Sequence, residues 1–367
     1  MNMMLLEDCC EILDSMRIPI KASDRKEGPY PYYGANGIQD HVDDYIFDDE
    51  LVLLAEDGGN FGSRERPIAY RVSGKCWVNN HAHVLKPKND SLDVDYLYYS
   101  LMFYNTAGLV NGATRQKLTQ ATMREMLIPM RSIEEQKHII EMLNRVVEIK
   151  FHRQNELVKL DELIKARFVE MFGDPVSNSY DLPEATLPDL GKFGRGVSKH
   201  RPRNDIKLLG GKYPLIQTGD VANAGLYITS YSNTYSELGL KQSKMWDKGT
   251  LCITIAANIA KTAILEFDAC FPDSVVGFTA NERTNNIFIH YWFSFFQAIL
   301  ESQAPESAQK NINLKILSEL KVIVPEKKKQ DEFAFFVEAT DKSKFAVQKA
   351  LDNAQLLFDS LMQKYFG

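Results

Sequence analysis

The chain has 367 residues, of which 44% are hydrophobic, and its formal net charge is −6. This length and apolar content suffice for two domains of ordinary size. The five cysteines form no Cys-x-x-Cys pair and no signal peptide is recognisable, so we expect a reduced, cytoplasmic protein. The most apolar stretch, 287–300, is too short to cross a bilayer, and no membrane role is indicated.

Residues recur at a spacing of about 194 positions along the chain. The matching pairs are Cys76-Trp77 with Cys270-Phe271, Gln136 with Gln330, Phe151 with Phe345, Gln154 with Gln348, Leu157 with Leu351, Leu163 with Leu357, and Phe172-Gly173 with Phe366-Gly367. A repeat this long cannot be one solenoid unit. It predicts two globular domains with pseudo-twofold symmetry, each followed by a long helix.

The first predicted domain covers 1–131 and mixes strands with turns. An apolar strand at 51–55 is followed by a glycine-rich tip at 58–62 and a return strand at 68–72. The aromatic segment 96–104 is read as a buried helix. Residues 1–60 carry 14 acids against 4 bases, whereas 61–131 carry 10 bases against 5 acids. The acidic stretch 40–57 is therefore expected to face solvent or a partner subunit.

A long helix is predicted over 132–173. Ser132 and Glu135 form a capping box, apolar residues follow at helical spacing, and Gly173 with Pro175 ends the helix. About 40 residues at 1.5 Å each make a rod of ~60 Å.

The second predicted domain, 174–325, repeats the same order of segments: strands at 251–255 and 262–267 flank a tip at 256–260, and an aromatic helix follows at 290–296. Its distinctive feature is the segment 192–212, which contains seven lysines or arginines and one aspartate, a net charge of +6. Such a segment is an electrostatic footprint for phosphates, or alternatively a solvated loop. In the second half, 38 residues from Pro175 to Lys212 precede the Tyr213-Pro214 pair, whereas only 29 residues precede the corresponding Tyr30-Pro31, so the first strand of domain 1 is expected to be missing or different.

The last segment, 326–367, is a second long helix without internal proline or glycine until its end. Each long helix has one apolar stripe and needs a partner surface. The economical solution is an antiparallel two-helix coiled coil; the alternative is that each helix folds back on its own domain.

Several motifs together resemble the specificity subunits of type I restriction-modification systems. They are Tyr30-Pro-Tyr-Tyr-Gly-Ala-Asn-Gly37, Lys261-Thr-Ala-Ile-Leu-Glu-Phe-Asp-Ala-Cys-Phe-Pro-Asp-Ser-Val-Val-Gly-Phe278, Gln309-Lys-Asn-Ile-Asn313, and Ile128-Pro129 leading to Glu134-Glu135-Gln136. The resemblance covers essentially the whole chain. It implies an α+β protein with two mixed α/β target recognition domains separated by two long helices packed as an antiparallel coiled coil, each domain reading one half of a split site in duplex DNA. It also implies that chemistry belongs to partner subunits: two methyltransferase subunits, which modify adenine, and restriction/translocase subunits, which cut unmodified DNA.

The residues themselves favour a DNA-recognition protein that catalyses no reaction and needs no cofactor. An adenine methyltransferase needs an Asn/Asp-Pro-Pro-aromatic loop, and the chain has no Pro-Pro. The tip 58–62 lacks the Lys-Ser/Thr of a nucleotide-binding loop. A metal-dependent nuclease using Asp189, Asp205 and Lys207 remains as an alternative, as does a coiled-coil scaffold without DNA. His81 and His83 could bind a metal with Asp57 or Cys76, but no third ligand has suitable spacing.

Candidate DNA contacts are basic or amide residues near the tips and in the basic segment. Those of the first domain are Arg64, Arg66, Asn79, Asn80, His81, Arg115 and Lys117. Those of the second are Lys192, Arg195, Lys199, His200, Arg201, Arg203, Asn258, Lys261, Gln309 and Lys310. Lys117 and Lys310 belong to a repeated Gln-Lys pair, for which a structural role is the alternative.

Overall fold

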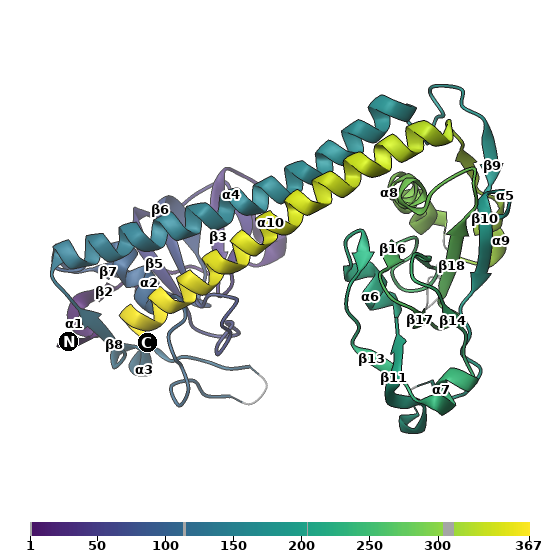
Figure 1. The fold of residues 1–367 in the computed structure, drawn as a ribbon. Coiled ribbons are helices and arrows are strands. Elements are labelled where there is room, and N and C mark those ends of the chain that lie inside the picture. Colours follow the sequence, from purple (N-terminus) through teal and green to yellow (C-terminus); the bar gives the residue numbers. More distant parts are fainter. Residues whose placement is uncertain (1, 113–114, 204, 304–311) are drawn as a thin grey trace. The chain divides into compact units, whose positions relative to one another are not determined.

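The computed structural model describes residues 2–112, 115–203, 205–303 and 312–367 (Figure 1). The chain divides into two compact units. Unit 1 comprises Met1–Arg153 together with Ala350–Gly367, and unit 2 comprises Gln154–Lys349. Each unit therefore contains part of both long helices.

Unit 1 is built on a six-stranded sheet with the strand order β2-β7-β5-β6-β3-β4. Its elements before the long helix are β1 (Asn2–Leu5), α1 (Leu6–Cys9), β2 (Cys10–Ile12), η1 (Asp14–Met16), η2 (Ala22–Asp24), β3 (Tyr30–Gly34), β4 (Gly37–Val42), β5 (Phe47–Ala55), β6 (Ala69–Val78), β7 (Ala82–Pro87), α2 (Val94–Met102), α3 (Gln120–Arg124) and β8 (Leu127–Met130). Strand β5 is central because its run Leu51–Ala55 is buried on both faces of the sheet. The predicted pair of strands around the first tip and the buried aromatic helix are confirmed as β5, β6 and α2.

Unit 2 contains a five-stranded sheet, β10-β18-β15-β16-β12, and a four-stranded sheet, β13-β11-β17-β14. Its elements are β9 (Glu184–Thr186), α5 (Leu187–Leu190), β10 (Gly191–Arg195), η3 (Ile206–Leu208), β11 (Leu209–Leu215), α6 (Thr218–Asn223), β12 (Tyr227–Ile228), β13 (Asn233–Tyr235), α7 (Glu237–Lys241), β14 (Met245–Trp246), β15 (Leu251–Thr254), β16 (Thr262–Leu265), β17 (Ala269–Cys270), β18 (Val275–Ala280), α8 (Asn286–Gln303), α9 (Leu314–Glu319) and β19 (Lys321–Ile323). The predicted pair of strands around the second tip is confirmed as β15 and β16.

The internal repeat is visible in the order and pairing of these elements. Strand β1 pairs with β8 in unit 1 as β9 pairs with β19 in unit 2, and a short helix follows β1 and β9 alike. Of the two alternatives for the initial strand of the first domain, its absence was wrong, and the strand differs by being shorter, with 3 residues in β2 against 5 in β10. Strand β2 is present and pairs with β7, as β10 pairs with β18; it escaped prediction because it has only 3 residues.

The long helices are α4 (Ile133–Phe172) and α10 (Lys327–Phe366), of 40 residues each. The capping box is confirmed: the Ser132 backbone N–H donates to Glu135 Oε2 at 3.1 Å, and the Glu135 N–H donates to Ser132 Oγ at 3.2 Å. Gly173 follows the helix with φ +75°, a conformation that glycine adopts without strain.

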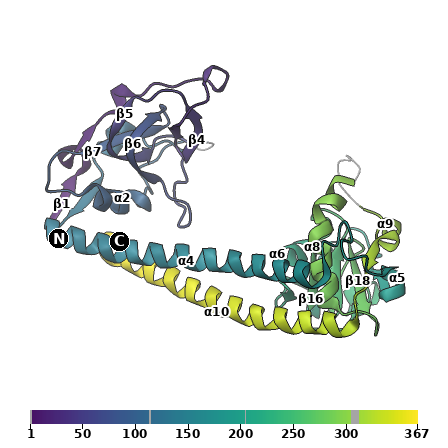
Figure 2. The same ribbon diagram turned by 90° about the horizontal axis from the view of Figure 1, so that it is seen from above.

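The two helices lie side by side in each unit and run antiparallel (Figure 2). In unit 1, the Lys150 ammonium lies 4.9 Å from the centroid of the Phe358 ring. In unit 2, Lys344 Nζ donates to Asp161 Oδ1 at 2.7 Å and the rings of Phe168 and Phe333 meet at 5.4 Å. The predicted antiparallel pairing of the helices is thus confirmed within each unit.

Candidate nucleic-acid interface

In unit 1, three of the predicted DNA contacts meet at the turn that follows β5. Arg115 Nη2 and His81 Nδ1 each lie 2.7 Å from Asp57 Oδ1, and Lys117 Nζ lies 2.9 Å from Glu56 Oε1. The backbone holds this arrangement together, because the N–H of Gly58 donates to the carbonyl of Gln116 at 3.0 Å. We call His81, Arg115 and Lys117 the unit 1 basic cluster.

The other candidates of unit 1 divide into exposed and buried residues. Arg64, Arg66 and Asn80 are exposed in turns. Asn79 is only 3% exposed; its Oδ1 accepts the His81 backbone N–H at 2.8 Å and its Nδ2 donates to Gln39 at 3.2 Å. The side chain of Asn79 therefore shapes the turn that carries His81 instead of facing outward.

A buried network of charged groups lies directly beneath the unit 1 basic cluster. The His83 side chain is fully buried, with Nδ1 2.6 Å from Asp14 Oδ2 and Nε2 2.9 Å from the Leu118 carbonyl oxygen. Each ring nitrogen of His83 therefore faces an oxygen that accepts hydrogen bonds. Arg17 completes the network by donating to Glu56 Oε2 at 2.6 Å.

Both carboxylates of this network are held in the ionised form. Burial opposes ionisation of Asp14, but the hydrogen bond and charge of His83 outweigh it and lower the pKa of Asp14 below its ordinary value. Burial likewise opposes ionisation of Glu56, and the hydrogen bonds from Arg17 and Lys117 lower its pKa. Sequence reasoning missed Asp14, Arg17 and Glu56, since only the register of the sheet brings them to His83.

Asp14, Glu56 and His83 form the one group with metal-ligand geometry in the described part of the chain. The carboxylates of Asp14 and Glu56, however, already face Arg17, Lys117 and the His83 ring. A positive ion would be repelled by Arg17 and Lys117, so the group fits an ion network and not a metal. His81 and His83 do not share a partner, because His81 pairs with Asp57 and His83 with Asp14.

In unit 2, the basic segment forms an exposed loop between β10 and η3. Arg201 Nη2 lies 3.5 Å from Asp273 Oδ2, and Arg203 donates to Asp273 Oδ1. Two backbone N–H groups, those of Lys199 and His200, donate to Gln242 Oε1 at 2.7 and 3.1 Å and fix the loop. We call Lys199, His200, Arg201 and Arg203 the unit 2 basic cluster.

The remaining candidates of unit 2 lie elsewhere. Lys192 and Arg195 are exposed on β10, the edge strand of the five-stranded sheet. Asn258 is exposed at the tip between β15 and β16, and the Lys261 backbone N–H donates to Thr254 Oγ1 at 3.1 Å. Gln309 and Lys310 lie outside the described residues.

The acidic residues of the nuclease alternative serve local structure. Asp189 Oδ2 accepts the Thr186 N–H at 3.0 Å and its hydroxyl at 2.6 Å, and Asp205 Oδ1 accepts the Lys207 N–H at 3.0 Å. Neither aspartate belongs to the metal-ligand group described above. The geometry therefore gives no support to a nuclease centre.

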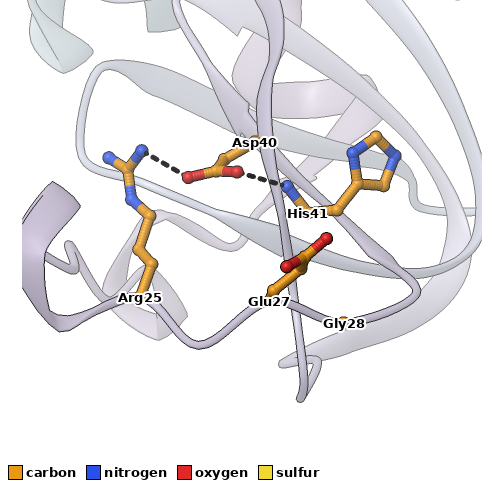
Figure 3. Close-up of a pocket in the computed structure, with 5 residues that line it drawn as sticks. All are labelled: Arg25, Glu27, Gly28, Asp40 and His41. Carbon is orange, nitrogen blue, oxygen red and sulfur yellow. Dashed lines mark hydrogen bonds and ion pairs between the residues drawn. The ribbon is translucent and has the colours of Figure 1, made fainter.

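A polar cavity of about 420 Å³ lies in unit 1 (Figure 3). It is lined by Arg25, Glu27, Gly28, Asp40 and His41. Asp40 accepts the His41 backbone N–H at 2.9 Å and pairs with Arg25 at 3.2 Å, and these bonds lower the pKa of Asp40. None of the candidate DNA contacts lines this cavity, so it adds nothing to the interface.

A repeated α+β fold with exposed basic loops in each unit defines a class of protein that recognises nucleic acid without chemistry of its own. The family described as "Type I restriction modification DNA specificity domain" matches residues 1–160 and 183–355. The chain belongs to this family and is a specificity subunit, the non-catalytic component that recognises DNA and assembles with other subunits of the system.

Individual relatives agree with this assignment. A putative type I restriction enzyme specificity subunit of Haemophilus influenzae is 26% identical over 98% of this chain and 92% of its own length. A putative type I specificity subunit of Mycoplasma pneumoniae is 21% identical over 90% of this chain and 86% of its own. The crystal structure of the S subunit of a type I restriction-modification system from M. genitalium has the same fold, with a TM-score of 0.62 at 16% identity, covering 100% of this chain and 96% of that one.

Within residues 2–112, 115–203, 205–303 and 312–367, no helix combines the length and the hydropathy needed to cross a membrane.

Proposed function

We propose that the chain reads a bipartite target in duplex DNA, one half-site by each unit, and directs adenine methylation or cleavage by partner subunits. The observation that carries this proposal is that each unit of the repeat has an exposed basic cluster that includes or contacts a residue of the same turn. His81 lies in the turn between β6 and β7, and Asp273, which pairs with Arg201 and Arg203, lies in the equivalent turn between β17 and β18.

The two clusters are proposed to bind phosphates, which gives affinity and register without reading sequence. Exposed polar side chains nearby are then available for base edges in the groove: Arg64, Arg66 and Asn80 in unit 1 and Asn258 in unit 2. Lys192, Arg195 and Lys261 are proposed as further phosphate contacts.

The proposed division of the chain is recognition domain 1 (1–131), central spacer helix (132–173), recognition domain 2 (174–325) and C-terminal spacer helix (326–367). A helix of 40 residues is ~60 Å long, which equals at most about 17 base pairs at 3.4 Å per pair. Two recognition domains on one face of the duplex would contact half-sites about one helical turn apart.

Exposed apolar side chains at repeated positions of the long helices support docking of two methyltransferase subunits. Phe151 is 59% exposed and its repeat partner Phe345 is 74% exposed; Leu163 and Leu357 are 49% and 50% exposed. Large apolar side chains in water mark interaction surfaces when they recur in a pattern. Because the pattern occurs once in each half of the repeat, two copies of one partner fit it. Restriction/translocase subunits are proposed to join the same complex.

The proposal is tested with a random-sequence duplex library and the methyltransferase encoded beside this chain. Adenine methylation at one split motif is expected only when the chain is present, and modification-sensitive sequencing reads it. Methylation that does not depend on the chain would refute the proposal.

A double substitution, Arg115→Ala with Lys117→Ala, sharpens this test. It should weaken binding to the target duplex and reduce the slope of log affinity against log salt for that duplex by roughly 2, because two phosphate contacts are lost. Lys86→Ala is the matched control, since Lys86 pairs with Asp49 outside the cluster. A changed target sequence with an unchanged salt slope would instead assign Arg115 or Lys117 to base reading.

A further inference from the structure

In both units, one aspartate pairs with two of the side chains that the proposed function identifies as DNA contacts. Asp57 lies 2.7 Å from both Arg115 and His81 in unit 1. Asp273 pairs with both Arg201 and Arg203 in unit 2. The two aspartates occur at different positions of the repeat, so the pairing is not a simple copy from one half to the other. The same electrostatic arrangement was reached twice.

We propose that Asp57 and Asp273 are specificity determinants that compete with DNA phosphates for the basic clusters. Each carboxylate forms ion pairs with the basic side chains of its cluster when the protein is free or bound to the wrong sequence. The correct base contacts supply the free energy to exchange the carboxylate for phosphate. This inference rests on the proposed function, because it requires the clusters to face DNA.

The first argument is that these ion pairs can open at little cost. Arg115 is 60% exposed at its side chain, and Arg201 and Arg203 are 55% and 46% exposed. Ion pairs that remain in contact with water contribute little to stability. A phosphate can therefore replace the carboxylate without unfolding the loop.

The second argument concerns the effect on affinity. Non-specific binding depends on the number of phosphates that the protein neutralises, and a cation paired internally does not count toward that number. A carboxylate left within about 4 Å of a phosphate also repels it. Both effects lower the affinity for DNA of any sequence. Base contacts therefore contribute a larger share of the difference in affinity between target and non-target DNA.

The third argument comes from other aspartates of unit 2. Asp189 and Asp205 accept backbone N–H groups and so cap short helices, and Asp205 Oδ2 lies in addition 3.1 Å from His200 Nε2. By contrast, the contacts found for the Asp273 side chain among the described residues are both with arginines. The role of Asp273 thus lies in its charge toward these arginines and not in fixing a backbone turn.

The test uses Asp57→Asn and Asp273→Asn, singly and together, in the full chain assembled with its methyltransferase subunits. Dissociation constants are measured for the target duplex and for a scrambled duplex over a series of salt concentrations. Each substitution should tighten binding to the scrambled duplex about tenfold and steepen its salt dependence by about 1 per released cation. Binding to the target should tighten much less, so that the specificity ratio falls.

Matched controls carry the same change of charge away from the clusters. Asp49→Asn removes the partner of Lys86 in unit 1, and Glu266→Gln removes the partner of Lys248 in unit 2. At physiological salt, charges beyond about 8 Å are largely screened, so both controls should leave the specificity ratio unchanged. Asp57→Ser and Asp273→Ser repeat the test should an asparagine variant fold poorly.

Two outcomes would overturn the inference. Unchanged binding to the scrambled duplex would show that the aspartates do not compete with phosphate. Weaker binding to the target, with the scrambled duplex unaffected, would show that they accept hydrogen bonds from bases. Failure of the proposed function is distinguishable from both, because the unsubstituted chain would then show no preference for any duplex.

Discussion

The same place in the repeated sheet holds charged groups in unit 1 and apolar groups in unit 2. The carbonyl of Glu56 accepts the Leu118 N–H at 2.7 Å, and the carbonyl of Ile255 accepts the Ile312 N–H at 2.9 Å, so Glu56 and Ile255 are equivalent. Two residues earlier in each strand, Leu54 lies opposite His83 as Ile253 lies opposite Val276. Val276 and Ile255 are both fully buried.

This difference teaches that the repeated fold does not need the buried charges. Apolar replacements of a buried ion network are often neutral or stabilising, and unit 2 has them in its own core. The network of unit 1 lies beneath Lys117, which it contacts through Glu56. Its position therefore links the buried charges to the presentation of the unit 1 basic cluster.

The largest effect is expected from breaking the network of unit 1. Asp14→Ala removes the carboxylate that pairs with His83 and Gln120 and leaves Arg17 with Glu56 alone, and should reduce the free energy of unfolding of unit 1 by about 3–5 kcal/mol. Val276→Ala at the apolar site of unit 2 should cost less, about 2 kcal/mol. Hydrogen exchange of the core strands measures the two units separately.

Asp24→Ala is the control for this comparison, because Asp24 is exposed in a short helix of the same type. Its effect should stay within about 0.5 kcal/mol. Equal protection factors for the Asp14→Ala and Asp24→Ala variants would mean that the network contributes nothing to stability.

A smaller and matched effect is expected where the two units are alike. Gln136 and Gln330 are both fully buried near the start of their helices. Gln136 Nε2 donates to the carbonyls of Ser91 and Arg131 at 2.8 and 3.0 Å. Gln330 Nε2 donates to those of Arg283 and Pro325 at 3.0 and 2.8 Å.

Substitution of either glutamine by alanine leaves these carbonyls without their side-chain donor. We expect each change to cost about 2–3 kcal/mol, with the same value in both units. Gln154→Ala, at an exposed position of α4, should be nearly neutral in the same hydrogen-exchange measurement. A clear difference between the stability losses of Gln136→Ala and Gln330→Ala would show that equivalent hydrogen bonds contribute differently to the stability of the two units.

The sequence predicted what depends on local pattern or on the repeat itself. The long helices, the strand pairs around the tips and the repeated glutamines follow from helical spacing, apolar runs and the spacing of about 194 residues. The four-stranded sheet of unit 2 was not predicted, because β14 and β17 have only 2 residues each. Strands of this length are too short to show the alternation of apolar and polar residues that predicts a strand.

The candidate interface could be predicted only as a set of residue types. Spacing did not show that Asp57 would pair with Arg115, 58 positions away, or that Asp273 would pair with Arg203, 70 positions away. Nor did it show that Asn79 would be buried while its neighbour Asn80 is exposed. These facts depend on which strands become neighbours, and that is decided by the whole sheet.

The smallest effect is a difference in the response of the units to mild acid. His290 of α8 lies with Nδ1 2.9 Å from the Thr262 hydroxyl, and burial, followed by the charge of Lys344, lowers the pKa of His290 from 6.5 to about 4. The unfolded chain takes up a proton near pH 6.5 and folded unit 2 does not. Stability of unit 2 is therefore complete above pH 6.5 and falls by at most about 1.4 kcal/mol per pH unit down to pH 4.

The carboxylates of unit 1 respond in a lower range of pH. The pKa values of Asp14 and Glu56 are lowered, so their contribution is present above their ordinary values, 3.8 and 4.5, and is lost only as the pH falls through the folded-state values. Between pH 6.5 and 5, protection of β15 and β16 should thus decrease relative to that of β5 and β6. His290→Gln should abolish the difference, because an amide does not titrate, whereas His138→Gln at an exposed site of α4 should preserve it. A difference that survives His290→Gln would assign the acid sensitivity of unit 2 to another group.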